Sequence, residues 1–134
     1  DKTAVAALNA DFFSVFSGDK GLALGVEVKD GEILQSPINP GTMATVSYED
    51  GQVLMSYLDF HIMAVAPNGE YQEVRHLNKH TSYFGDILMY TKEFNGGMSP
   101  APGGEVCEVV VEDGKVMEFR RNMPPAENPH NGCV

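Results

Sequence analysis

Two short apolar segments flank an Asp-Gly pair in the stretch Val26-Glu27-Val28-Lys29-Asp30-Gly31-Glu32-Ile33. The same arrangement recurs in the stretch Val109-Val110-Val111-Glu112-Asp113-Gly114-Lys115-Val116. An Asx-Gly pair supplies the positive φ angles of a two-residue type I′ turn, whose twist matches that of the flanking strands. Two more such pairs, Asp50-Gly51 and Asn68-Gly69, also stand between apolar-rich segments. The sequence therefore predicts four β-hairpins, each closed by two residues.

The predicted strands can be written as four antiparallel pairs. They are Leu24–Lys29 with Glu32–Ser36, Met43–Tyr48 with Gln52–Leu58, Asp59–Ala66 with Glu70–Leu77, and Glu105–Glu112 with Lys115–Arg120. In the last hairpin Cys107, Val109 and Val111 alternate with more polar neighbours, so we expect them to face the core. No long amphipathic helix is visible. The predicted class is α+β, consisting mainly of antiparallel β hairpins with little helix.

Length and composition indicate one globular domain over residues 1–134. The chain has 43% hydrophobic and 21% charged residues, which is ordinary for a folded protein. Its 14 glycines and eight prolines favour strands and tight turns over a helical bundle. From Met123 onward, residues 123–134 contain three prolines and show no periodicity. We expect this segment to be an extended, linker-like tail.

The charge balance argues against two classes of partner. The formal net charge is −10, and the one adjacent basic pair is Arg120-Arg121. Binding to nucleic acid requires clustered basic side chains that displace counterions from phosphate, so no nucleic-acid partner is expected. No apolar run approaches the roughly 20 residues of a membrane span, so no membrane insertion is expected.

Neither the cysteines nor the histidines predict a metal site or another cofactor. Cys107 and Cys133 lie too far apart for a zinc or redox motif, and two unpaired thiols are the favoured reading, with one bridge as the alternative. His76 and His80 have a spacing that suits a metal only on a helix. Because they follow a predicted strand, a solvated loop is the favoured interpretation.

Three segments carry a resemblance to a known family. They are Ala6-Ala7-Leu8-Asn9-Ala10-Asp11-Phe12-Phe13 with the following Gly21–Gly25 and hairpin, then His76-Leu77-Asn78, then Asp86-Ile87-Leu88-Met89-Tyr90-Thr91. In this order and spacing they resemble the phosphodiester glycosidase family, which includes the uncovering enzyme of mannose 6-phosphate and many bacterial surface and exopolysaccharide-related proteins. The first segment is moderately specific, and the other two gain weight from their order.

This resemblance implies a function and a location. The implied activity is that of a hydrolase that removes a sugar from a sugar-1-phosphodiester on a glycan or exopolysaccharide, in a secreted or cell-surface protein. Two departures qualify it. Ala10 stands where the family often has glycine, and the family's later Arg-Thr strand and glycine-rich segment do not occur. The resemblance therefore implies that this chain holds the front part of the domain and lacks its C-terminal part.

The residues expected at the site lie mostly in the first segment. Asp11 is the candidate catalytic carboxylate, and Asn9, at strand spacing from it, would hold it or bond a sugar hydroxyl. The competing reading is that both Asx side chains satisfy backbone groups in a turn. Phe13 and Asn78 are the candidate substrate-binding residues. A Phe12-Phe13 pair more often packs in a core than stacks on a sugar.

A second class of function stays open at this point. The chain can instead be a non-catalytic surface module that binds glycan, or a structural scaffold. The expected partner is a carbohydrate or a glycan phosphodiester. Homo-oligomerisation is a further expectation, because strands at the edge of a sheet present unpaired backbone groups to another chain.

Overall fold

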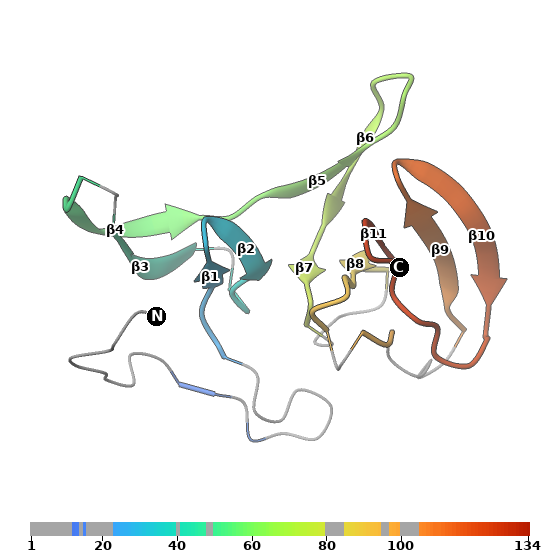
Figure 1. Cartoon of the computed structure of the whole chain (residues 1–134), viewed down its shortest axis with the longest axis horizontal. Coiled ribbons are helices and arrows are strands. Elements are labelled where there is room, and N and C mark those ends of the chain that lie inside the picture. The colour runs from blue at the N-terminus through green and yellow to red at the C-terminus, as the bar shows by residue number, and fades with distance from the viewer. Residues whose placement is uncertain are drawn as a thin grey trace.

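The computed structural model describes Phe12, Phe13, Val15 and residues 23–39, 41–47, 50–79, 85–94, 97–99 and 105–134, with the backbone alone for 42–47. Eleven strands make up its regular structure (Figure 1). They are β1 (Glu27–Lys29), β2 (Glu32–Gln35), β3 (Gly41–Ser47), β4 (Val53–Asp59), β5 (Ile62–Val65), β6 (Tyr71–Val74), β7 (His76–Leu77), β8 (Leu88–Met89), β9 (Cys107–Glu112), β10 (Lys115–Arg121) and β11 (Gly132–Cys133).

Hairpins dominate this architecture, as the sequence predicts. The antiparallel pairs β1–β2, β3–β4, β5–β6 and β9–β10 coincide with the four predicted hairpins. The described residues form no helix, so the predicted α+β class is too mixed and the protein is mostly β. The strands form five small sheets instead of one large one, and β7–β8 is the parallel pair among them. Residues 4–8, expected to form a buried strand, lie outside the described part of the chain.

Two of the four turns have the predicted type. Asp30 and Gly31 both have positive φ, and so do Asp113 and Gly114, as a type I′ turn requires. The prediction of two-residue turns is wrong for the other two hairpins. In the β5–β6 hairpin the N–H of Ala66 donates to the carbonyl of Glu70 at 2.8 Å, so three residues, 67–69, form the loop; in the β3–β4 hairpin the last described pair is Ser47 with Val53. The Gly of each Asx-Gly pair has positive φ in these longer loops, but the preceding Asp or Asn does not.

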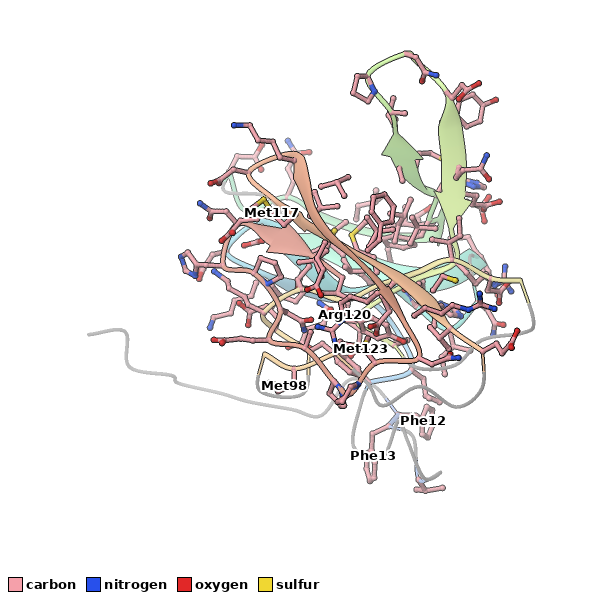
Figure 2. The ribbon with its side chains drawn as sticks, turned by 90° about the vertical axis from the view of Figure 1, so that its right-hand side faces the viewer. Phe12, Phe13, Met98, Met117, Arg120 and Met123 are labelled. Carbon is pink, nitrogen blue, oxygen red and sulfur yellow. The ribbon has the colours of Figure 1, made fainter. Side chains whose placement is uncertain are left out.

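The covered side of β9 differs from the predicted one at Cys107 and Val109, whereas Val111 is half-buried. Cys107 is exposed and Val109 is 37% exposed, whereas Glu108 and Val110 are half-buried. The reason is an ion pair: Arg120 donates to Glu108 at 3.1 Å, and both side chains are about nine-tenths buried. Arg120 also donates to the carbonyl of Pro124, so the tail covers this face (Figure 2). Apolar alternation predicted the wrong residues here because the side chain that is buried, Glu108, is charged and is paired with Arg120.

The tail at 123–134 is extended but does not behave as a free linker. β11 adds to β9 in the order β10-β9-β11. Upstream of it, Asn128 donates its backbone N–H to Gly97 and its side-chain N–H to the carbonyl of Thr91. Val134 exchanges two backbone hydrogen bonds with Tyr90. These bonds join the last hairpin to the β7–β8 pair.

The cysteines are both unpaired, which confirms the favoured reading. Cys133 lies opposite Val111, four residues along β9 from Cys107. At the rise of a strand this offset is roughly 13 Å, well beyond the span of a disulfide.

Candidate functional site

The centre of this protein is more polar than its sequence suggests. Among the described residues the buried apolar side chains are Pro37, Val74, Tyr90, Phe94 and Val134, while the buried polar ones are Gln35, Ser36, His76, Asn78, Lys79, Ser99 and Asn128. Five of these seven lie at the end of β2 or on and just after β7. We call this group (Gln35, Ser36, His76, Asn78 and Lys79) the polar centre. Buried polar groups are costly unless they are hydrogen-bonded, so their partners define what the centre does.

The polar centre is built where three segments of chain run side by side. β7 pairs with β8 in parallel, with His76 opposite Leu88. On its other side β7 meets the end of β2, where Ser36 and Leu77 are joined by two hydrogen bonds of 3.2 and 3.0 Å. Apart from the hydrogen-bonded sheets, the main contact between strands is this one between β2 and β7.

Asn78 connects all three segments. Its side-chain amide donates to the carbonyl of Leu34 at 2.7 Å and to Oγ1 of Thr91 at 2.8 Å, while its Oδ1 accepts from the N–H of Thr91 at 2.8 Å. Its φ is +54°, in the left-handed region that Asn tolerates better than most residues. Both side-chain N–H bonds are therefore committed to the protein itself. Asn78, predicted to bind substrate, is 3% exposed, and its side chain joins the three segments inside the protein.

Lys79 extends the polar centre toward the first segment of the family resemblance. Its side chain is 1% exposed, and Nζ donates to the carbonyls of Leu24 and Gly25 at 3.0 and 3.1 Å. Gln35 donates to the neighbouring carbonyl of Ala23 at 2.7 Å. Two buried side chains thus hold residues 23–25 in place.

Residues 23–25 in turn hold the segment that contains the predicted aromatic site. The N–H of Leu24 donates to the carbonyl of Phe12 at 2.9 Å, and Phe13 forms an antiparallel bridge with Ala23. Phe13 is 58% exposed and Phe12 82%, so neither ring is packed in the core, and both project from one end of the protein (Figure 2). The candidate catalytic residues Asn9 and Asp11 lie outside the described residues, directly before this anchored pair.

His76 is a second buried group that the sequence interpretation misplaced. It lies on β7 with 4% exposure, so the prediction of a solvated loop is wrong for this residue; His80 lies outside the described part. Burial lowers the pKa of His76 below 6.5, and the charges of Arg75 and Lys79 lower it further, whereas Asp86 and a hydrogen bond to the Pro37 backbone raise it. Its Nδ1 has no hydrogen-bond partner. The imidazole is therefore held neutral.

The polar centre borders a small hollow, and no metal cluster is found among the described residues. Within the described ranges no three His, Cys, Asp or Glu side chains gather as a metal site would require. A hollow of about 10 Å³, large enough for roughly one water molecule, is lined by residues that include Ser36, Pro37 and Arg75. A larger open hollow of about 290 Å³ lies at the tip of the β3–β4 hairpin, on residues that include Asp50 and Gln52. It contains none of the predicted site residues.

Sequence reasoning missed Lys79 because a lone lysine after a strand is usually solvated. One available signal was its position directly after the second segment of the resemblance, which ends at Asn78. Burial of a lysine needs oxygen partners, and these come from carbonyls 54 and 55 residues away in the chain. No local pattern encodes that contact.

Fold and centre together define a mostly β structure, with mainly antiparallel small sheets and a polar centre. No protein-family model matches the chain, and no curated protein matches it at a significant level. A crystal structure of a hypothetical protein from Synechocystis is similar to it, with a TM-score of 0.72 and 21% sequence identity over 93% of this chain. At that identity the likeness shows the fold alone. This chain covers 23% of the length of the Synechocystis chain. In the part described here, no helix is long and apolar enough to cross a membrane.

Proposed function

We propose that this chain is the front part of a secreted or cell-surface hydrolase domain that cleaves a sugar from a sugar-1-phosphodiester. One observation supports this most: three segments that are far apart in the sequence, and that carry the resemblance to phosphodiester glycosidases, meet at the polar centre. Asn78 of the second segment bonds Thr91 of the third, and the adjacent Lys79 bonds Leu24 and Gly25, which follow the first.

In this proposal the polar centre positions the reacting residues and does not touch the substrate. Asp11 is the carboxylate that exchanges a proton with, or attacks, the sugar, and Asn9 orients it. Phe13 offers an exposed ring face to the sugar. Asn78 and Lys79 are positioning residues, because their side chains are buried and bonded to the backbone of the segments they hold.

The test is turnover of an activated sugar-1-phosphodiester by the complete gene product. We expect sugar release, and we expect Asp11→Asn to lower it by roughly tenfold or more, the low end of what a positioned acid or base contributes. Asp30→Asn is the matched control, because Asp30 has a φ of +51° in an exposed type I′ turn that Asn suits equally well. Equal turnover in Asp11→Asn and wild type would remove Asp11 from the mechanism, and no turnover by the complete product would remove the hydrolase proposal.

A glycan-binding module without catalysis is the second candidate. The observation that favours it is the exposure of both rings of the Phe12-Phe13 pair, since aromatic faces that are not packed in a core can stack on sugars. Saturable binding of glycan by the chain, weakened by Phe13→Ala and unaccompanied by turnover, would favour this reading over hydrolysis.

A further inference from the structure

The tail, residues 123–134, docks on the segment that follows β8. Its middle pairs with residues 97–99 through two backbone hydrogen bonds of 2.8 and 2.6 Å and an antiparallel bridge. Its end returns to β8, where Val134 exchanges two backbone hydrogen bonds with Tyr90 (Figure 1). The tail is therefore fixed at two points, which lie before and after Thr91 in the sequence.

Asn128 is the tail residue whose side chain reaches this segment from the interior. It is 4% exposed, and its Nδ2 donates to the carbonyl of Thr91 at 2.8 Å. Its Oδ1 is buried and has no hydrogen-bond partner among the described residues. A buried acceptor without a partner costs stability, so an apolar side chain of the same shape would suit a purely structural position better. What the asparagine contributes is its donor, which holds the carbonyl of Thr91.

Thr91 connects this tail contact to the polar centre. The N–H of Thr91 donates to Oδ1 of Asn78 at 2.8 Å, and its Oγ1 accepts from Nδ2 of Asn78 at 2.8 Å. One residue thus has its carbonyl held by the tail and its N–H and hydroxyl held by the polar centre. Because hydrogen bonds weaken steeply when their distance or angle changes, movement of Thr91 at one contact disturbs the other.

Asn78 is joined to the anchor of the first segment by two routes. The next residue, Lys79, donates to two carbonyls within residues 23–25 at 3.0 and 3.1 Å. Nδ2 of Asn78 also donates to the carbonyl of Leu34 at 2.7 Å, and the following Gln35 donates to a third carbonyl of residues 23–25 at 2.7 Å. Residues 23–25 are thus held by the chain neighbours of Asn78 and of its partner.

We propose that Asn128 is a positioning residue of the candidate site, and that the docked tail holds the aromatic segment of that site in place. The route runs through Thr91 and Asn78 to residues 23–25, which form a bridge with Phe13. Each link is a hydrogen bond or a chain neighbour, and a contiguous network of this kind can carry coupling between distant segments. The contact between Phe13 and sugar rests on the proposed function, whereas the coupling does not.

Hydrogen exchange under native conditions tests the coupling. Asn128→Leu keeps the branched shape and removes the donor, so the amide of Leu24, which donates to Phe12, should exchange about fivefold faster, the effect of losing one hydrogen bond. Ser99→Ala is the matched control: Ser99 is 1% exposed and its Oγ accepts a tail N–H at 2.9 Å, but among the described residues it is not bonded to Thr91. That control should leave the Leu24 amide within about twofold of wild type.

Substrate kinetics of the complete gene product show whether the coupling serves the site. With the activated sugar-1-phosphodiester, Asn128→Leu should raise KM about fivefold and change kcat less than about twofold, because it loosens a residue that binds substrate. Ser99→Ala should change neither constant. A variant that only lost stability would lose kcat through loss of folded enzyme and would keep its KM.

Asn128→Ala guards against crowding by the larger leucine and should match Asn128→Leu in both measurements. Exchange at Leu24 that is unchanged in both Asn128 variants would overturn the inference, and so would equal acceleration by Ser99→Ala. Faster exchange in an active enzyme whose KM stays at the wild-type value would remove the positioning role. Faster exchange with no turnover by any form, wild type included, would support the coupling and remove the proposed function.

Discussion

The polar centre and the β3–β4 hairpin hold the chain together in opposite ways. In the polar centre, side chains such as Lys79 and Asn78 are almost completely buried and are bonded to backbone groups from distant segments. In the β3–β4 hairpin the ladder is local, and the described side chains of β4 are largely open to solvent. Substitutions should therefore be costly in the first region and nearly free in the second.

The largest effect is expected at Lys79. Lys79→Met removes the donor for two carbonyls in the interior, and each unsatisfied group costs roughly 1–3 kcal/mol. We expect the free energy of unfolding to fall by about 3 kcal/mol in urea denaturation. Lys115→Met is the control, since Lys115 is exposed on β10 and should change stability by less than about 0.5 kcal/mol. Equal effects of the two substitutions on the free energy of unfolding would contradict the expected difference between the polar centre and the exposed hairpins.

Asn78 should have the next largest effect. Asn78→Ala loses three hydrogen bonds and places a Cβ residue without a polar side chain at a φ of +54°, which should cost about 2 kcal/mol or more. Asn78→Gly loses the same bonds without the backbone penalty, so it should be milder by roughly 1 kcal/mol. Thermal and urea unfolding of the two variants separates the contributions. If Gly and Ala were equally destabilising, the left-handed backbone would contribute nothing.

His76 predicts how the stability of the polar centre depends on pH. Because the folded pKa is lowered, the unfolded chain binds a proton more readily than the folded one. The contribution of neutral His76 to the free energy of unfolding is complete above pH 6.5. It declines as the pH falls from 6.5 toward the folded pKa, by at most about 1.4 kcal/mol per pH unit. His76→Gln should remove that slope. His61→Gln should keep it, since the His61 side chain is 68% exposed.

The smallest effect concerns the two thiols. Cys107 is exposed, whereas Cys133 is half-buried and burial raises the pKa of its thiol. A thiol reagent at neutral pH should therefore modify Cys107 first, because the thiolate is the reactive form. Cys107→Ser should abolish the fast phase, and Cys133→Ser should leave it intact. A fast phase that survives in Cys107→Ser would place Cys133 at the surface and the tail away from β9.

Local sequence predicted the hairpins well because their information is local. Asp30-Gly31 and Asp113-Gly114 fix the turn type and the residue pairs next to the turn, before each ladder shifts its register. The same Asx-Gly pattern wrongly predicted two-residue turns at Asp50-Gly51 and Asn68-Gly69, where the loops are longer. Which face of β9 is covered depended on the Glu108–Arg120 pair and on the returning tail, so alternation could not decide it.

The catalytic and substrate-binding roles expected at the candidate site stay predictions. The resemblance pointed to Asn78 and to the segment around Thr91, and these do meet, but the structure gives Asn78 an internal role where the sequence suggested contact with a sugar. Asp11 as a catalytic residue stays a prediction. The burial of Lys79 and His76 could be recognised only in the structure. It depends on segments more than 30 residues away, and no periodic sequence pattern links such distant segments.

The sequence by itself determined that this chain forms β-hairpins, where the chain reverses, and that both cysteines lack a zinc or redox spacing. These properties follow from φ preferences and from residue spacing, which act over a few neighbours. Only the tertiary structure decided that the polar centre is buried and that the tail returns to pair with β9. Those outcomes depend on which distant carbonyls and edges come within hydrogen-bonding distance, and that is a property of the whole fold.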